Sequence, residues 1–208
     1  MGDRTFDAFV VRWRTAHPAR PGLATRIAET YLRLPYALAR PLVRVPPNVV
    51  TSAGLLVAVA TIPAYRIGVV AGLLILVSGL LDSVDGAVAL LANTATRRGA
   101  VWDATADRLA DVAFLVGPAL HEPVAAFVAA GIGTFLLEYV RAWTHALGMT
   151  ENERVTPGER PTRVVLLALG AVTGWWVYAA CAVAALTVIG VALLLNDVRA
   201  RSTTPASG

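Results

Sequence analysis

Residues 79–111 read GLLDSVDGAVALLANTATRRGAVWDATADRLAD and set five carboxylates against long apolar stretches of the chain. The five aspartates are Asp82, Asp85, Asp103, Asp107 and Asp111. A carboxylate near the middle of a bilayer costs about 2.5–3.5 kcal/mol on insertion scales. Five such groups beside membrane segments therefore predict a counter-charge or a water-filled site.

The composition of the whole chain is that of a membrane protein. Of its 208 residues 56% are hydrophobic and 15% are charged, with a mean hydropathy of +0.62. Soluble domains carry about 25% charged residues, so the composition excludes a disordered chain, a fibrous repeat and a basic nucleic-acid tail. The net charge of +4 comes from 18 arginines with no lysine, and we interpret it as loops that face anionic lipid headgroups, with no nucleic acid partner.

Uncharged stretches predict an all-α, polytopic membrane protein with six transmembrane helices. A crossing helix needs about 20 mostly apolar residues. The candidates are 45–65 and 164–196, which are uncharged, and three mainly apolar stretches that contain charged residues: 67–96 with Asp82 and Asp85, 99–120 with four charged residues, and 123–144 with Glu138 and Arg141. The last stretch is uncharged for 33 residues, about 50 Å as a single helix. Because Gly170, Thr173 and Gly174 offer a turn, we expect a hairpin of two helices there, with one long tilted helix as the alternative.

The arginines alternate between loops in a way that predicts the orientation. Eight of them lie in residues 1–44, and further clusters lie in three later segments, 97–98, 154–163 and 199–201. The intervening loops hold one arginine in total. The positive-inside rule then predicts a multi-pass protein of the cell membrane, with both termini and the active site on the cytoplasmic side.

Residues 23–44 predict an amphipathic helix on the inner membrane surface, bent near Pro35. Its apolar residues recur at helical spacing: Ile27, Tyr31, Leu34 and Leu38. A solvated helix packed on the loops is the alternative. The predicted organisation is a flexible segment at 1–22, this surface helix, a six-helix transmembrane catalytic domain at 45–200 and a C-terminal tail at 201–208.

The spacing of the aspartates predicts a metal site. Asp82 and Asp85 are three residues apart, and Asp103 and Asp107 are four apart, so each pair shares one helix face. The two helices follow one another through a short loop, so the four carboxylates can converge near the cytoplasmic side. Such an all-oxygen cluster suits Mg²⁺ or Mn²⁺, and without His or Cys it argues against zinc. An ion pathway and a structural salt-bridge network remain as alternatives.

The same stretch carries a family signature. From Asp82 to Asp107 it reads D-x-x-D-G-x-x-A-L-x8-G-x3-D-x3-D, which closely resembles the CDP-alcohol phosphotransferase signature D-x-x-D-G-x-x-A-R-x8-G-x3-D-x3-D. The run PNVVT at 47–51 is similar to the family's entry into its first helix, and the resemblance covers about residues 24–200. Residues 99–108, 139–142 and 159–163 most resemble the actinobacterial phosphatidylinositol phosphate synthases.

The resemblance implies a fold and a reaction. It implies an amphipathic surface helix, six membrane helices and a homodimer. The reaction is transfer of a phosphatidyl group from a CDP-alcohol, such as CDP-diacylglycerol, to an acceptor hydroxyl with release of CMP, in phospholipid biosynthesis. By resemblance Asp82, Asp85 and Asp103 bind two Mg²⁺ or Mn²⁺ ions per active site. Asp107 would hold the second ion and accept the hydroxyl proton as general base.

Two further groups of residues are expected to bind the substrates. The CDP-alcohol site is expected to comprise Pro47, Asn48, Thr51, Gly86, Ala89, Thr96 and Arg98. Guanidinium groups suit a phosphorylated acceptor such as inositol phosphate or glycerol phosphate, and the candidates are Arg141, Arg160, Arg163 and Arg199. Headgroup anchoring is the alternative for each of these arginines.

Leu90 departs from the signature, which has Arg at this position. The family's Arg is taken to contact the phosphates of the nucleotide, and Arg98 in the adjoining loop is a candidate substitute. Because of this departure, a pseudoenzyme that binds CDP-lipid without turnover remains an alternative function. A membrane cation carrier is the other alternative, although residues 67–81 and 112–120 lack polar groups that could relay an ion.

Overall fold

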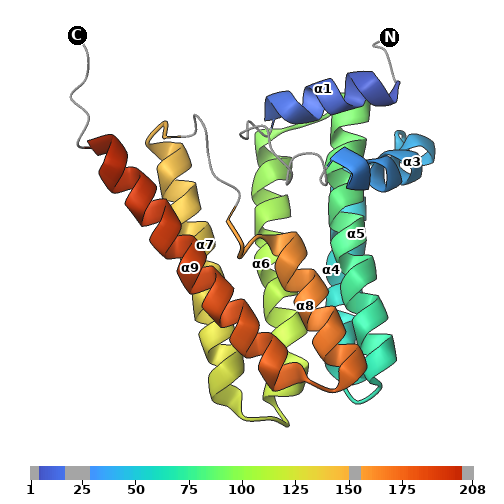
Figure 1. The fold of residues 1–208 in the computed structure, drawn as a ribbon. Coiled ribbons are helices and arrows are strands. Elements are labelled where there is room, and N and C mark those ends of the chain that lie inside the picture. The colour runs from blue at the N-terminus through green and yellow to red at the C-terminus, as the bar shows by residue number, and fades with distance from the viewer. Residues whose placement is uncertain (1–4, 17–28, 150–155, 203–208) are drawn as a thin grey trace.

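The computed structural model describes residues 5–16, 29–149 and 156–202, and these residues form helices without any strand (Figure 1). The all-α class predicted from the sequence is therefore confirmed. The helices are α1 (Phe6–Ala16), α3 (Arg33–Leu42), α4 (Pro47–Ala64), α5 (Gly68–Ala92), α6 (Arg97–Ala119), α7 (Val124–Ala146), α8 (Arg160–Thr173) and α9 (Trp176–Ser202).

Local sequence signals explain where the central helices begin and end. Pro47 occupies the first turn of α4, where the missing N–H leaves no bond unmade. Asn93 ends α5 in the left-handed conformation, with φ of 54°. Thr96 then caps α6, because its side-chain oxygen accepts a hydrogen bond from the Gly99 amide at 3.0 Å. The link between the two aspartate-bearing helices is therefore only four residues long, 93–96.

The long uncharged stretch 164–196 is divided into two helices, as expected. Gly174 separates α8 from α9 with φ of +75°, a backbone conformation that favours glycine. The Cβ of an added side chain at Gly170 would lie 3.3 Å from the Trp175 carbonyl oxygen, so the turn is tightly packed. The single tilted helix is excluded by this break.

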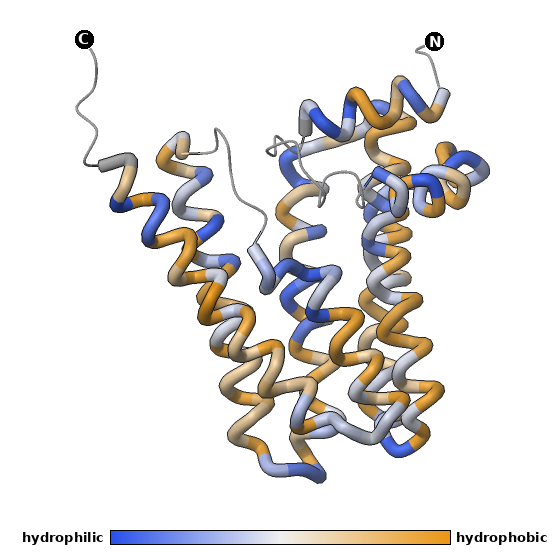
Figure 2. Tube along the Cα trace, viewed as in Figure 1, coloured by the Kyte–Doolittle hydropathy of each residue, from blue (hydrophilic) through white to orange (hydrophobic). Residues whose placement is uncertain are grey.

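Among the helices in the described part of the chain, four are long and apolar enough to cross a membrane: α4, α5, α7 and α9. Helix α6 is long enough to cross a membrane, but it carries Asp103, Asp107, Arg108 and Asp111. Helix α8 has 14 residues and spans about 21 Å, less than the ~30 Å hydrocarbon core. Figure 2 shows hydrophilic residues where α6 and α8 begin, on α1 and α3, and near the end of α9, with mainly apolar residues along the middle of the bundle.

The described helices pack around three apolar clusters. Helix α4 lies against α5 and α6, α8 lies on α5, and α7 pairs with α9. Helices α1 and α3 lie across the end of the bundle where α5 ends and α6 begins (Figure 1). Many of the core residues are alanines, which let helix backbones approach closely.

The N-terminal region differs from expectation. Residues 6–16 of the segment expected to be flexible form α1, because Phe9 is buried to 1% exposure and packs on Tyr36 with ring centroids 5.4 Å apart. The residues of this region up to 4 and from 17 to 28 lie outside the described residues, and with them Ile27 and the first part of the expected surface helix.

The described part of the surface helix turns a different face inward. Helix α3 begins at Arg33, after a turn at Leu32, so the break lies before Pro35 and not at it. Leu32 and Ala39 are buried against α1 and α5. The face predicted to be apolar is exposed on the protein, and its described members are Tyr31, Leu34 and Leu38. An exposed apolar face at this end of the bundle fits contact with lipid.

The contact between α7 and α9 can be tested with two glycines of α7. Gly133→Ala should lower the free energy of unfolding by about 1–3 kcal/mol, because its methyl group would collide with the hydroxyl of Thr187. Thr187 is fully buried and donates to the Val183 carbonyl at 2.9 Å, so it cannot move away easily. The measurement is thermal unfolding of the purified protein in detergent.

Gly131→Ala is the matched control for Gly133→Ala. A methyl group at Gly131 would lie 3.7 Å from Leu115 Cδ1, an ordinary contact, and alanine is favoured over glycine within a helix by about 0.5–1 kcal/mol. This variant should be as stable as the wild type or more so. Equal destabilisation by both substitutions would show that the α7–α9 contact does not limit stability.

Candidate active site

Three of the predicted carboxylates lie together at the centre of the site. One oxygen from each of Asp82, Asp85 and Asp103 lies within 4.8 Å of the other two. Asp82 and Asp85 occupy adjacent turns of α5, and Asp103 extends from α6 across the short link. The structure thus brings these three side chains together, while Asp107 lies outside this group.

Helix α4 supports the α5 side of this carboxylate group. The Thr51 hydroxyl lies 2.5 Å from Asp85 Oδ2 and donates to it, and Asp85 is only 4% exposed. Two helical turns earlier in α5, the Ser78 hydroxyl donates to the Gly54 carbonyl at 3.0 Å. Thr51, expected to contact the CDP-alcohol, therefore orients a carboxylate in this structure.

The three carboxylates fit a hard divalent cation. Asp103 Oδ1 is buried and has no hydrogen-bond partner among the described residues. A buried anionic oxygen without a donor is costly, and a cation shared by the three carboxylates would satisfy it. The group contains only oxygen ligands, which Mg²⁺ and Mn²⁺ prefer.

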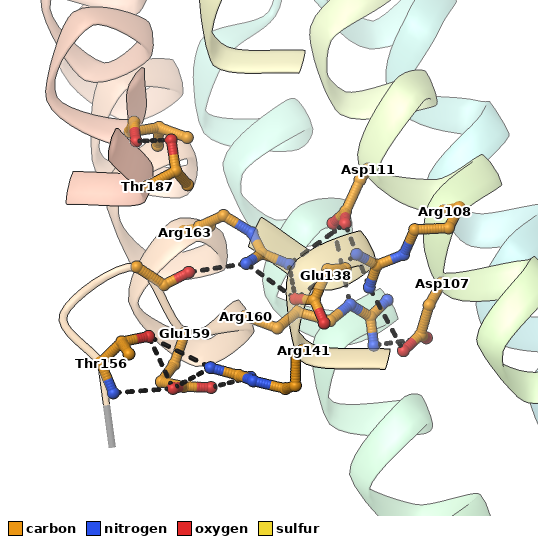
Figure 3. Close-up of polar contacts among 12 residues, drawn as sticks. Asp107, Arg108, Asp111, Glu138, Arg141, Thr156, Glu159, Arg160, Arg163 and Thr187 are labelled. Carbon is orange, nitrogen blue, oxygen red and sulfur yellow. Dashed lines mark hydrogen bonds and ion pairs between the residues drawn. The ribbon is translucent and has the colours of Figure 1, made fainter. Parts of the chain in front are cut away.

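Asp107 is held by an arginine from α8. Arg160 Nη1 lies 2.6 Å from Asp107 Oδ1, and the same nitrogen also pairs with Asp82. Arg160 Nε lies 3.7 Å from Asp111 Oδ1, and the Arg160 side chain is only 12% exposed. Figure 3 shows its guanidinium between Asp107 and Asp111. Asp111 also pairs with Arg108, whose Nη2 lies 3.4 Å from Asp111 Oδ2.

Behind Arg160, a second set of charges joins α6, α7 and α8 (Figure 3). Arg163 is 3% exposed, and its Nη2 lies 3.3 Å from Asp111 Oδ2 and 3.1 Å from Glu138 Oε1. Arg108 also lies 3.4 Å from Glu138 Oε1. Glu138 was not expected at the site from the sequence. The available signal was its position as a carboxylate within an otherwise apolar stretch.

The four arginines expected to bind an acceptor do not form one pocket in this structure. Arg160 alone of them contacts the predicted metal and base carboxylates. Arg163 is buried in the second set of charges, and Arg141 pairs with Glu159 at 2.6 Å. Arg199 is exposed near the end of α9.

The residues expected to bind the CDP-alcohol surround the start of α6 and one face of α5. A Cβ added at Gly99 would lie 3.3 Å from Asn48 Oδ1 and 3.1 Å from Thr96 Oγ1, so these three residues are neighbours. Gly86 is exposed, and a Cβ added there would meet no atom within 4 Å. Glycine at 86 therefore faces open space rather than a packed helix, which leaves room for a ligand beside Asp85.

Leu90 lies beneath α1. It packs with the apolar residues of this helix, and Arg12 Nη1 donates to the Leu90 carbonyl at 3.1 Å. A guanidinium from another element therefore lies beside the position where the family signature has Arg. Arg98 is exposed on the first turn of α6.

Comparison with known proteins assigns the class. Residues 44–195 match the sequence profile of the CDP-alcohol phosphatidyltransferases, and the chain belongs to this family. It is accordingly an enzyme that transfers substituted phosphate groups, and its apolar helices are those of a membrane protein. The resemblance noted in the aspartate signature is confirmed.

Two relatives show how similar the chain is to individual proteins of known name. The chain is 32% identical over 204 residues to the phosphatidylinositol phosphate synthase of Mycolicibacterium smegmatis, covering 89% of this chain and 90% of that protein. It is 37% identical over 109 residues, or 50% of this chain, to the bifunctional IPC transferase and DIPP synthase of Rubrobacter xylanophilus, but covers only 25% of that longer protein.

Solved structures of a phosphatidylinositol phosphate synthase from Mycobacterium tuberculosis are also similar. The form with CDP-DAG bound has a TM-score of 0.68 and 28% identity, covering 84% of this chain and 96% of that one. The form in complex with manganese and citrate has a TM-score of 0.67 and 29% identity, covering 82% and 90%.

The buried charges behind Arg160 generate a stability prediction. Arg163→Gln should lower the free energy of unfolding by about 3–5 kcal/mol, because it leaves the buried carboxylates of Asp111 and Glu138 short of positive charge. The measurement is the thermal unfolding midpoint in detergent. Arg98→Gln removes an exposed arginine and should change stability by no more than about 0.5 kcal/mol. Equal midpoints for the two variants would contradict a structural role for Arg163.

Proposed function

We propose that this protein transfers the phosphatidyl group of CDP-diacylglycerol, or a similar CDP-alcohol, to a hydroxyl of inositol phosphate and releases CMP. The observation that carries the proposal is the convergence of Asp82, Asp85 and Asp103 beside the open face of Gly86. The names of the relatives support the donor and the acceptor, since similar chains are phosphatidylinositol phosphate synthases and one has CDP-DAG bound. Glycerol phosphate is the second candidate acceptor.

Two divalent ions, Mg²⁺ or Mn²⁺, are proposed to be held by the four carboxylates. Asp82, Asp85 and Asp103 form the first set of ligands, and Asp107 completes the second with Asp82. Bound there, the ions would stabilise charge on the attacking and leaving oxygens. The manganese complex of the similar synthase supports the choice of cation.

The chain's own residues are assigned the remaining tasks. Asp107 accepts the proton of the acceptor hydroxyl, whose oxygen forms a bond to the phosphorus that carries diacylglycerol. The bond from this phosphorus to the bridging oxygen breaks, and CMP leaves with that oxygen. Gly86 and Ala89 leave space for the cytidine head, and its polar contacts are Asn48, Thr51 and Thr96, next to Pro47 and Arg98.

Arg160 is the proposed phosphate contact for the acceptor, supported by its position beside Asp107. Arg141, Arg163 and Arg199 remain predictions for this pocket. Arg141 and Arg163 already pair with carboxylates, so a phosphate would compete with Glu159 or with Glu138 and Asp111.

The proposed membrane arrangement has six crossings, made by α4 to α9. Helices α6 and α8 are included among the crossings, although α6 carries charged residues and α8 is short. We place both termini and the active site on the cytoplasmic side and the chain in a homodimer. The common location of α1 and the C-terminal end of α9 at one end of the bundle supports this placement of the termini (Figure 1).

The metal ligands can be tested directly. Asp82→Asn, Asp85→Asn and Asp103→Asn should each reduce CMP release from CDP-diacylglycerol by at least 100-fold and weaken Mn²⁺ binding, because each removes a charged oxygen from the converging group. Asp107→Asn, a substitution of the same type outside that group, should retain cation binding at the first site while the rate falls. EDTA should abolish the wild-type reaction, and added Mg²⁺ or Mn²⁺ should restore it.

The same assay separates the alternatives. CMP release with inositol phosphate but not glycerol phosphate supports the proposed acceptor, and the reverse selects glycerol phosphate. Binding of CDP-lipid without CMP release from any acceptor would identify a pseudoenzyme. Cation movement into vesicles without CMP release would identify a carrier, and full activity in EDTA would exclude the metal mechanism.

The loss of Arg at position 90 leads to another prediction. Two guanidinium groups can replace it, Arg98 on the first turn of α6 and Arg12 on α1, and Arg12 already donates to the Leu90 carbonyl. A hydrogen bond to a charged group contributes about 1.5–3 kcal/mol, so Arg12→Gln should raise the KM for CDP-diacylglycerol by roughly ten- to a hundred-fold if Arg12 serves the phosphates. Leu90→Arg should restore the KM in that background.

Arg14→Gln is the control on the same helix. Arg14 is exposed and pairs with Glu29 at 2.7 Å, so its loss should leave the KM unchanged. If Arg98→Gln raises the KM and Arg12→Gln does not, Arg98 supplies the replacement charge. If neither Arg12→Gln nor Arg98→Gln changes the KM, position 90 needs no replacement charge.

A further inference from the structure

We propose that Arg160 is a built-in cation of the active site that competes with the second divalent ion for Asp82 and Asp107. This inference rests on the proposed function, because it concerns the same carboxylates. Its consequence is that the site binds its two ions one after the other, with unequal affinity.

The competition follows from shared atoms. Asp82 contributes an oxygen to the converging group with Asp85 and Asp103, and the same carboxylate pairs with Arg160. Asp107 is outside the converging group and pairs with Arg160 at 2.6 Å. A first cation can use Asp85 and Asp103, neither of which contacts Arg160 in the described structure, whereas a second cation needs the Asp107 carboxylate that Arg160 holds.

The charge balance favours binding of the first divalent ion over binding of the second. Four carboxylates carry four negative charges, and Arg160 stays protonated at any working pH. With Arg160 in place and one divalent ion bound, a single negative charge remains for a second ion. Opposite charges about 4 Å apart interact by about 4 kcal/mol at an effective dielectric constant of 20, so the guanidinium is a strong competitor at this largely buried position.

Arg160 can leave the two carboxylates without disrupting the rest of the site. Asp111, its third partner, is also paired with Arg163 at 3.3 Å and with Arg108 at 3.4 Å. Release of Arg160 therefore exposes Asp82 and Asp107 to a cation and leaves no third carboxylate unpaired. A phosphate that enters with the substrate is the natural recipient of the freed guanidinium, so substrate binding and second-ion binding should strengthen each other.

The test is a Mn²⁺ titration of the purified full-length protein in detergent without substrate, followed by electron paramagnetic resonance. The wild type should show one tight site and a second site at least tenfold weaker. Arg160→Gln should tighten the second site by about tenfold or more, while changing the first site less. Arg14→Gln removes an exposed arginine of α1 that pairs with Glu29 at 2.7 Å, away from the aspartates, so both affinities should remain as in the wild type.

A second variant, Arg160→Lys, serves as a control in case Arg160→Gln does not fold. Arg160→Lys keeps the charge but replaces the planar fork by a point charge, so the affinity of its second site should lie between those of the wild type and Arg160→Gln. Two sites of equal affinity in the wild type, or a second site unchanged in both variants, would overturn the competition while leaving the metal site intact. Absence of any Mn²⁺ binding to the wild type would instead reject the proposed metal site itself, and the competition with it.

Discussion

Neutralisation of buried charge is the constraint on which the rest of this structure depends. Helices α6, α7 and α8 bring acidic and basic side chains into a bundle whose remaining surface is largely apolar. Arg163 is nearly fully buried, and it is tolerated because Asp111 and Glu138 approach it from two other helices. Each charge thereby fixes the position of a neighbouring helix as well as its own partner.

This arrangement separates structural from reactive carboxylates within one short stretch of α6. Asp111 is surrounded by Arg108, Arg160 and Arg163, so its charge is already compensated. One helical turn earlier Asp107 has Arg160 as its close partner, and Asp103 keeps a buried oxygen without a hydrogen bond. Neutralisation of the carboxylates by arginines therefore decreases along α6 toward the α5–α6 link. The carboxylates nearest this link are the ones best able to take part in the chemistry of the site.

The aspartates could be placed from the sequence because their relation is local. Spacings of three and four residues put side chains on one helix face whatever the helix packs against, and the short link after α5 requires the two faces to be close. Arg160 could be assigned to the cytoplasmic side but not to Asp82 and Asp107, because that contact depends on how α8 packs on α5. Glu138 was missed for the same reason. The packing of Leu32 and Ala39 against the bundle could not be predicted, because helix α1, which contributes Phe9 to the same cluster, was not expected.

In the proposed arrangement, in which α8 crosses the bilayer, its shortness has a consequence for the lipids around the protein. A helix of 14 residues spans about 21 Å, roughly 9 Å less than a typical hydrocarbon core. Its first residue is Arg160, which pairs with Asp82 of α5 and Asp107 of α6, so the polar end of α8 lies level with the carboxylates of its longer neighbours. Hydrophobic mismatch of this kind is relieved by thinning of the bilayer next to the short helix. A thinned annulus shortens the distance between the headgroup of a membrane-resident donor and the aspartates, so a lipid can present its phosphates without its acyl chains leaving the hydrocarbon.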